Sequence, residues 1–324
     1  MQAVVYYRYG SPDALECRDI EKPEPGSGEI LIRVQAAAVN PYDWHFLRGT
    51  PVFIRLLTGL RNPKSPRLGA DCAGIVEAIG RGVERLKAGD NVFGVCKGSF
   101  AEFACGKESE LSLVPPNVTF AQAASLPIAG ITALQGLRDC GQLKAGQAVL
   151  VNGAAGGVGT FAVQIATALG ATVTAVCSTR NREMVEALGA HQVIDYNRED
   201  FTTTPGAFDV IFDLVGNRSL SAIRQALKPN GIFVGCGGGG PDEPSGKLLG
   251  SMLGRALIAP FSRQRLTGVL AKVNTADLDV LSSMLASGEI KPVLDRAYPL
   301  RDTADAIRYV EGCHARGKVI IAVA

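Results

Sequence analysis

The chain has 324 residues, of which 47% are hydrophobic, 20% are charged and 38 are glycine. This length and composition predict a globular protein of two domains and exclude a disordered or collagen-like chain. Lysine and arginine together number 33 and aspartate and glutamate 31, so the net charge of +2 gives no general reason to expect nucleic-acid binding.

The first twenty residues, MQAVVYYRYGSPDALECRDI, do not place a basic segment before an apolar one, so they do not read as a secretory signal. The weakly polar run 121–137 contains Pro127 and is too short to cross a bilayer. These patterns predict a soluble, cytoplasmic protein.

The eight cysteines are scattered and form no C-x-x-C pair. Zinc ribbons and redox dithiols place two cysteines close together in the chain, so neither is expected. The cysteines are predicted to be reduced thiols buried in the core.

Residues 1–120 contain short apolar runs broken by glycine and proline, which predicts a Greek-key or barrel-like β domain. The clearest are EILIRVQAAAV, AGIVEAIG and NVFGV. Between the first two lies NPYDWH, in which Tyr42 and Trp44 alternate along the chain. We expect one of them to line a cleft and the other to pack inside.

From residue 121 onward, strand-like and helix-like segments alternate. The predicted strands are QAVLVNG, ATVTAVCS, QVIDY, FDVIFDLVG and IFVGCG, and the intervening helices are VGTFAVQIATALG, REMVEALG and LSAIRQALKPNG. Repeated βα units predict a doubly wound parallel sheet with right-handed crossovers, and hence an α/β fold.

The segment 244–276 carries five basic residues and no acidic one. We interpret it as a mobile lid over a cleft, with Phe261 near the pocket; weak peripheral contact with an anionic membrane is the alternative. The tail then alternates helix and strand and is expected to complete the first domain. The predicted domains are 1–120 with 289–324, and 121–288.

The strongest motif is VLVNGAAGGVGTFAVQIA, in which a strand passes through a glycine-rich turn into a helix. Such a turn lets backbone N–H groups and the helix dipole bind a pyrophosphate. The alternative is a glycine turn without a ligand. The residues predicted to face the cofactor here are Ala154, Gly156, Gly157 and Val158.

NADPH is predicted over NADH from the end of the second strand of this unit. The chain reads Ser178-Thr179-Arg180-Asn181-Arg182, with no carboxylate to bind an adenosine ribose or repel a 2'-phosphate. Ser178, Arg180 and Asn181 are the proposed contacts, and Arg180 or Arg182 can pair with the phosphate. Alternatively, these residues only cap the next helix.

The whole chain resembles the zinc-free quinone oxidoreductase branch of the medium-chain dehydrogenase/reductase superfamily. The matching stretches, in order, are AAAVNPYDW, LGADCAGIVEAIGRGVERLKAGDNVFG, FAEFA, ASLPIAGITALQGL, NGAAGGVG and LGAHQVIDY. Within the branch, NPYDWH, CSTRNREMVEALGA and HARGKVII look most like chloroplast-envelope-type quinone oxidoreductase homologues and alkenal/enone reductases. The resemblance implies a GroES-like β domain, a Rossmann domain and an active site in the cleft between them.

The resemblance also bears on zinc. Where zinc-dependent members carry a cysteine this chain has Asn40, and where they carry Gly-His-Glu it has Gly69, Ala70 and Asp71. Asparagine and alanine cannot supply a thiolate and an imidazole, so no metal is expected.

The resemblance places further residues at the cofactor: Asn40, Thr132, Tyr196, Val215, Gly216 and Lys318. His45 stands where several relatives carry lysine, and a ring with an ordinary pKa of about 6.5 can polarise a carbonyl or deliver a proton. Equally, His45 can be a partly buried ring with one backbone hydrogen bond. The candidate catalytic residues are His45, Asn40 and Tyr42, and the substrate pocket is assigned to Tyr42, Trp44, Phe53 and Phe261.

Together these features predict a monomeric or homodimeric enzyme that uses NADPH to reduce a small-molecule quinone or an α,β-unsaturated carbonyl compound. Two alternatives remain: a reductase of one biosynthetic intermediate, and an NADPH-binding protein without turnover.

Overall fold

The computed structural model describes residues 1–236 and 262–323 and divides the chain into two compact units. Unit 1 contains Met1–Ile131, Lys272–Gly288 and Pro292–Ala324, and unit 2 contains Thr132–Ala271 and Glu289–Lys291, each within the described residues. Each unit is a group of residues in close contact, and compactness alone does not establish which segments fold together as a domain. The boundaries at 120/121 and 288/289 therefore stay a prediction.

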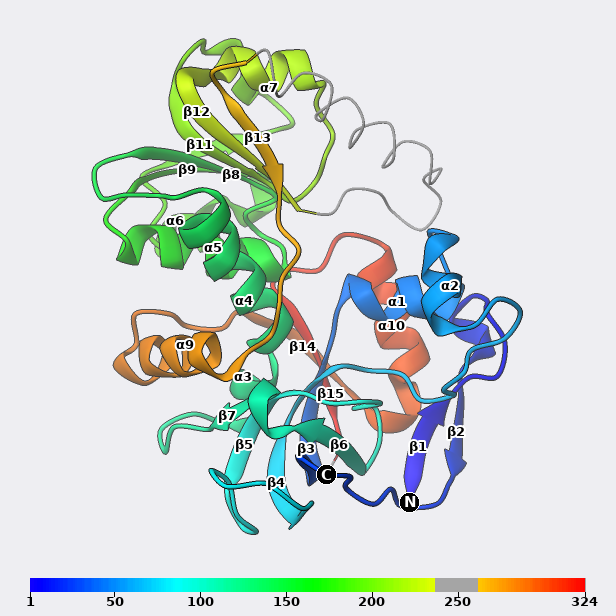
Figure 1. The fold of residues 1–324 in the computed structure, drawn as a ribbon. Helices are drawn as coiled ribbons and strands as arrows, with labels where there is room; N and C mark the ends of the chain where they lie inside the picture. The colour runs from blue at the N-terminus through cyan, green and yellow to red at the C-terminus, as the bar shows by residue number, and fades with distance from the viewer. Residues whose placement is uncertain (237–261, 324) are drawn as a thin grey trace. The chain divides into compact units, whose positions relative to one another are not determined.

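Unit 1 is built on a mixed sheet in which β3 (Glu29–Val39) is a central strand (Figure 1). The strand order is β14-β15-β3-β4-β5-β7, and β6 also pairs with β3. All neighbours are antiparallel except β14 and β15. The other bounds are β4 Asp71–Ile79, β5 Asn91–Val95, β6 Phe103–Lys107, β7 Leu111–Leu113, β14 Leu294–Pro299 and β15 Lys318–Ala322, with a separate hairpin of β1 Gln2–Val5 and β2 Glu16–Asp19.

The helices of unit 1 come from both ends of the chain. They are α1 Pro41–Arg48, α2 Phe53–Thr58, α3 Phe120–Ala124, α9 Thr275–Ser287 and α10 Thr303–Glu311. Helices α1 and α10 pack together, and Arg48 joins them through two hydrogen bonds to Glu311, at 2.6 and 3.1 Å. The N-terminal and C-terminal parts of the chain therefore share one core.

The strand-like alternation read into NPYDWH is wrong, because this stretch begins helix α1. Asn40 is an extended cap residue, Pro41 opens the helix, and Gly49 ends it in the left-handed conformation at φ 60°. These are ordinary helix start and stop signals.

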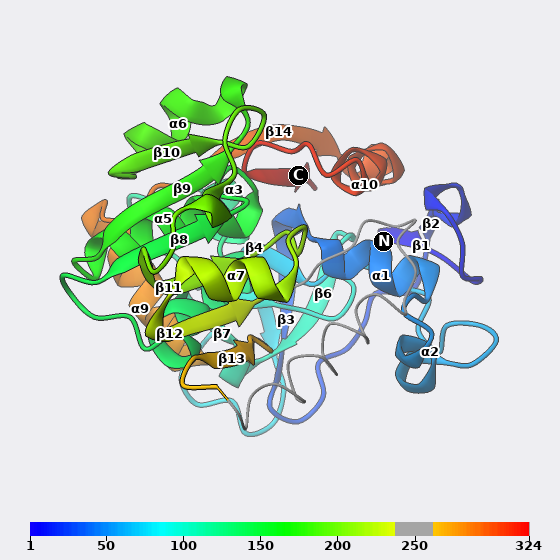
Figure 2. The same ribbon diagram turned by 90° about the horizontal axis from the view of Figure 1, so that it is seen from above.

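Unit 2 is a six-stranded parallel sheet in the order β10-β9-β8-β11-β12-β13 (Figures 1 and 2). Helices α5 and α6 pack on β8, β9 and β10, and α7 packs on β12. The direction of travel reverses at β8, so right-handed crossovers place the two sets on opposite faces. The bounds are β8 Ala148–Asn152, α5 Gly157–Ala168, β9 Thr172–Cys177, α6 Arg182–Ala187, β10 Gln192–Asp195, β11 Phe208–Asp213, α7 Leu220–Ala226, β12 Leu227–Gly235 and β13 Arg265–Gly268; α4, Pro127–Gln135, precedes them.

Two predictions in this unit need correction. The helix expected over LSAIRQALKPNG ends at Ala226, because the residue before Pro229 is pushed out of the helical region, and β12 starts at Leu227. The described part of the predicted lid contains β13, which pairs with β12 as a sixth strand. Most of that basic segment, including Phe261, lies outside the described residues.

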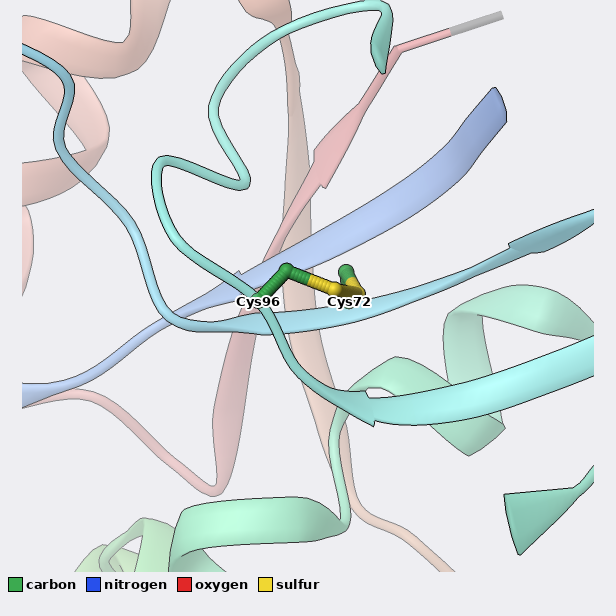
Figure 3. The surroundings of a disulfide bond; sticks show 2 residues. All are labelled: Cys72 and Cys96. Atoms are coloured by element: carbon green, nitrogen blue, oxygen red, sulfur yellow. A yellow bond between two sulfur atoms is a disulfide. The ribbon is translucent and has the colours of Figure 1, made fainter. Parts of the chain in front are cut away.

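The prediction that all eight cysteines are buried and reduced is also wrong. Cys72 on β4 and Cys96 just after β5 form a disulfide between neighbouring strands (Figure 3). Cys17 and Cys313 are exposed. Strand pairing brings the first two together across 24 positions of sequence, which spacing rules based on C-x-x-C cannot detect. No helix among the described residues is both long and apolar enough to cross a membrane.

Candidate functional site

The glycine-rich turn of unit 2 joins β8 to α5 as its motif predicts. Gly153 has φ 88°, and helix α5 begins at Gly157. A Cβ atom on Gly159 would lie 2.1 Å from the carbonyl oxygen of Gly153, so only glycine fits this approach of helix to strand. The first turn of a helix has N–H groups without intrahelical partners, which suits an anion. The turn therefore has the geometry of a pyrophosphate cradle.

The end of β9 brings together the residues predicted to recognise a 2'-phosphate. A short turn at Thr179–Asn181 follows the strand, and Asn181 donates to Ser178 Oγ at 3.1 Å. Asn181 is buried, and none of the residues in the ranges 1–236 and 262–323 is a hydrogen-bond partner of its Oδ1 atom. Arg180 is exposed. The turn thus places the Arg180 guanidinium next in sequence to Asn181, whose amide oxygen is unsatisfied within the described residues.

The neighbouring strand supplies an acidic residue that sequence reasoning missed. Asp195, buried at the end of β10, accepts from Thr179 Oγ1 at 2.5 Å. This hydrogen bond is the main reason that the pKa of Asp195 lies below its usual range. Asp195 therefore holds the turn after β9, and the adjacent Tyr196 is 50% exposed.

Asp213, at the end of β11, fixes the loop that carries Val215 and Gly216. Its Oδ1 atom accepts from the N–H groups of both residues at 3.0 Å and from Asn152 Nδ2 at 2.8 Å. Asn152 ends β8. The sequence signal was present, since both polar residues close apolar strands at the carboxyl edge of a parallel sheet, where ligands bind.

In unit 1, three neighbouring strands bring Asn40, Asp71 and Lys318 together. Ala38 on β3 is opposite Asp71, which starts β4, and Val39 is opposite Val319 on β15. Lys318 Nζ donates to Asn40 Oδ1 at 2.5 Å and lies 3.5 Å from Asp71 Oδ2. Asn40 Nδ2 donates to the same Asp71 oxygen at 2.9 Å.

This cluster is almost completely buried. Asp71 is 0% exposed, Asn40 2% and Lys318 3%. Burial raises the pKa of Asp71, and the nearby Lys318 opposes that rise. Burial lowers the pKa of Lys318, and Asp71 opposes that change. The charged form of Lys318 and the charged form of Asp71 therefore stabilise each other.

Helix α1 carries the other candidate catalytic residues. His45 is half-buried and stacks on Trp44 with ring centroids 3.6 Å apart. Its Nδ1 atom lies 2.8 Å from the carbonyl oxygen of Thr50, so Nδ1 carries the hydrogen. Burial lowers the pKa of His45, which favours the neutral ring. This geometry is the half-buried ring with one backbone hydrogen bond that the sequence left as an alternative; a proton-donor role for His45 stays a prediction.

The residues assigned to the substrate pocket are differently exposed. Trp44 lies in the core of unit 1 at 3% exposure, whereas Tyr42 is 42% and Phe53 58% exposed. Partial burial raises the pKa of Tyr42 to about 12, so its hydroxyl keeps its proton near neutrality. Thr132 on α4 is buried. The pocket assignments stay predictions.

The positions that bind zinc in metal-dependent members do not form a ligand set in this chain. Zinc sites use thiolate, imidazole or carboxylate ligands. The Asn40 amide is already bonded to Lys318 and Asp71, and Ala70 has no donor atom. Within residues 1–236 and 262–323, no three His, Cys, Asp or Glu side chains gather in a way that could hold a metal ion.

Comparisons with known proteins place the whole chain. Residues 26–116 match the family model "Alcohol dehydrogenase GroES-like domain", and residues 188–321 match "Zinc-binding dehydrogenase". The chain is 31% identical to a chloroplastic quinone-oxidoreductase homologue of Spinacia oleracea, across 99% of this chain and 98% of that protein.

Two further proteins are informative. An NADPH-dependent alkenal/one oxidoreductase of Arabidopsis thaliana is 34% identical, across 99% of this chain and 79% of its own. The structure of Escherichia coli quinone oxidoreductase complexed with NADPH superimposes with a TM-score of 0.84 at 25% identity, covering all of both chains. The GroES-like and Rossmann-like parts of the predicted fold are confirmed by these matches. The chain belongs to the medium-chain dehydrogenase/reductase superfamily of oxidoreductases, in the branch of the quinone oxidoreductases.

Proposed function

We propose that the chain is an NADPH-dependent, zinc-independent reductase of quinones or of the activated C=C bond of α,β-unsaturated carbonyl compounds. The observation that carries the proposal is the end of β9. There Ser178, Arg180 and Asn181 follow the strand that adjoins the glycine turn, and no carboxylate occupies the place of a ribose acceptor. A relative described as an NADPH-dependent alkenal/one oxidoreductase supports the same chemistry.

Each unit contains residues that we propose as cofactor contacts. In unit 2 the turn from Ala154 to Val158 would hold the pyrophosphate, Arg180 the 2'-phosphate, and the loop at Val215 the nicotinamide end. In unit 1 the pair Asn40 and Lys318 offers an amide and a cation to the nicotinamide ribose. The bound cofactor would supply a hydride from its nicotinamide ring.

Reduction of an enone builds negative charge on the carbonyl oxygen, so a donor must stabilise that oxygen. We assign this role to the hydroxyl of Tyr42, because its pKa of about 12 keeps it protonated at working pH. His45 is the second candidate. It is the weaker candidate because its neutral ring donates Nδ1–H to the carbonyl oxygen of Thr50, which leaves Nε2 as an acceptor rather than a donor.

The residues that surround Asn40 support the proposed zinc independence. A zinc ion at this position would have to displace the Lys318 ammonium from Asn40 Oδ1, and the amide it would gain is a poor ligand. Quinones and enones do not require a Lewis acid in the way that alcohol oxidation does, because their own carbonyl accepts the charge. We expect metal analysis to find no zinc and chelators to leave turnover unchanged.

A kinetic screen with a labelled cofactor tests the proposal. NADPH deuterated at the nicotinamide C4 is incubated with the protein and a panel of quinones and 1-alken-3-ones, and products are examined by NMR. Deuterium on the β-carbon of an enone, or oxidation of NADPH by a quinone, supports the assignment. Cofactor binding without oxidation across the panel would identify a binding protein without turnover instead.

The choice of cofactor is tested separately with Arg180→Ala. Losing the phosphate contact should weaken NADPH binding by about tenfold or more and leave NADH binding unchanged. Arg301→Ala, which removes an exposed arginine of unit 1, is the control. Equal affinity for both cofactors in the unmodified protein, unchanged in Arg180→Ala, would refute the preference for NADPH.

A further inference from the structure

Helix α1 contains a fourth buried polar residue beside the Asn40, Asp71 and Lys318 cluster. Asp43 is 0% exposed. Its Oδ2 atom accepts from the backbone N–H of Asn40 at 2.7 Å, but its Oδ1 atom has no hydrogen-bond partner among the described residues. The predictions from sequence give Asp43 no role.

The charges near Asp43 do not balance if every group is ionised. Among the described residues, the groups that act on it electrostatically are Asp71 on β4, Lys318 on β15, Tyr6 after β1 and Tyr42 on α1. Burial raises the pKa of each tyrosine to about 12, so both are neutral. Two carboxylates would then share one ammonium and leave a net negative charge in the interior, which is costly.

Of the two carboxyl groups, Asp71 is the better-stabilised anion. It accepts from Asn40 Nδ2 and from the Ile128 N–H at 3.1 Å, and Lys318 lies 3.5 Å away. Within the part of the chain that the structure describes, Asp43 has one backbone donor only. A proton on Asp43 makes the cluster neutral, because the Asp71 carboxylate then balances the Lys318 ammonium. An unpaired buried hydroxyl also costs far less free energy than an unpaired buried carboxylate.

Asp43 also determines where the Asn40 side chain lies. Its hydrogen bond holds the backbone of Asn40 at the start of α1, and from there Asn40 Oδ1 reaches Lys318. An ionised Asp43 would add a second anion that attracts Lys318, and so would draw the ammonium away from Asn40. The contact between Asn40 and Lys318 would then depend on the protonation of Asp43.

We propose that Asp43 is a positioning residue that keeps its proton at neutral pH, and that this proton maintains the Asn40–Lys318 pair for cofactor binding. The part concerning the cofactor rests on the proposed function, whereas the proton itself does not. Burial raises the pKa of Asp43 to about 8, with Asp71 adding to the rise and Asn40 and Lys318 opposing it. Cofactor affinity should accordingly fall as the pH rises through about 8.

Asp43→Asn is the decisive variant because an amide mimics the protonated acid. Its oxygen can accept from the Asn40 N–H, and its NH₂ group replaces the hydroxyl. The matched control is Asp277→Asn, at the third residue of α9. Asp277 is also buried and also exchanges hydrogen bonds with its cap residue, Asn274, but it lies outside the cluster.

NADPH affinity is measured by fluorescence titration from pH 6.5 to 9. The unmodified protein and Asp277→Asn should bind about tenfold more weakly at pH 9 than at pH 7, because about nine-tenths of Asp43 is then ionised. Asp43→Asn should keep its neutral-pH affinity throughout. The same fall in Asp43→Asn as in the unmodified protein would overturn the role in binding.

Infrared spectroscopy detects the proton without the cofactor. At pH 6.5 the unmodified protein and Asp277→Asn should show the C=O stretch of a buried carboxylic acid, and Asp43→Asn should lack it. A spectrum that is the same in all three proteins would overturn the assignment. If none of the proteins binds NADPH at pH 7, the proposed function fails, and the infrared band still decides whether Asp43 is protonated.

Discussion

Removing the cation from the buried cluster should destabilise unit 1 strongly and in a pH-dependent way. Lys318→Met keeps the volume of the side chain. It leaves Asp71, which is 0% exposed, without the ammonium group that lies 3.5 Å from its Oδ2 atom. Breaking a buried ion pair by removing one partner costs about 3–5 kcal/mol. With about 2–4 °C lost per kcal/mol for a domain of about 150–250 residues, the Tm of unit 1 should fall by roughly 10 °C at pH 8.

The pH dependence follows from the direction of the pKa shifts. A buried carboxyl group with a raised pKa gives its full contribution to stability at low pH, and this contribution is lost as the pH rises through the raised pKa. In Lys318→Met the pKa of Asp71 rises further, because the opposing ammonium is gone. The difference from the unmodified protein should therefore be small near pH 5 and large at pH 8.

Two further variants separate charge from packing in this experiment. Lys318→Met combined with Asp71→Asn leaves no unpaired carboxylate of Asp71 and should recover most of the lost stability. Lys228→Met breaks a pair with Asp209 whose side chains are 43% and 21% exposed, and it should cost less than about 1 kcal/mol. The reasoning is refuted if Lys318→Met unfolds within 2 °C of the control at pH 8, or if adding Asp71→Asn recovers nothing.

Two other predictions follow from the same structure. Gly159→Ala would place a Cβ atom 2.1 Å from the Gly153 oxygen, so the start of α5 must move; NADPH affinity should fall at least tenfold by fluorescence titration while the unfolding of unit 1 is unchanged. His45→Gln should lose about 1 kcal/mol of stability with the Thr50 hydrogen bond but keep the pH profile of kcat from pH 6 to 9. A displaced acidic limb in that profile would make His45 a working proton donor.

Local sequence signals are sufficient to predict most of unit 2. The strand over Ala148–Asn152, the glycine turn and the helix over Gly157–Ala168 are consecutive in the chain, so periodicity and turn chemistry describe them directly. The helix predicted over LSAIRQALKPNG is too long, because Pro229 disfavours the helical conformation in the residue before it. The β13 strand, Arg265–Gly268, could not be predicted in the same way, because its four residues lack alternation and are defined by pairing with β12.

The cluster in unit 1 is harder to predict, because its members are close only after the sheet has formed. Lys318 is 278 positions from Asn40 and reaches it because β15 pairs with β3. Family resemblance identified Asn40 and Lys318 one at a time, but resemblance to relatives does not state which atoms meet or how many charges are buried.

Asp43 is a residue whose protonation state neither the sequence nor the family resemblance predicts. In the sequence it is an unremarkable acidic residue three positions after a helix cap, where a carboxylate ordinarily accepts a backbone hydrogen bond and stays ionised in water. Complete burial removes the water, and Asp71 takes the nearest cation, so the same residue is expected to hold a proton instead. Its charge is determined by two strands that lie far from it in the chain, and only the folded arrangement reveals it.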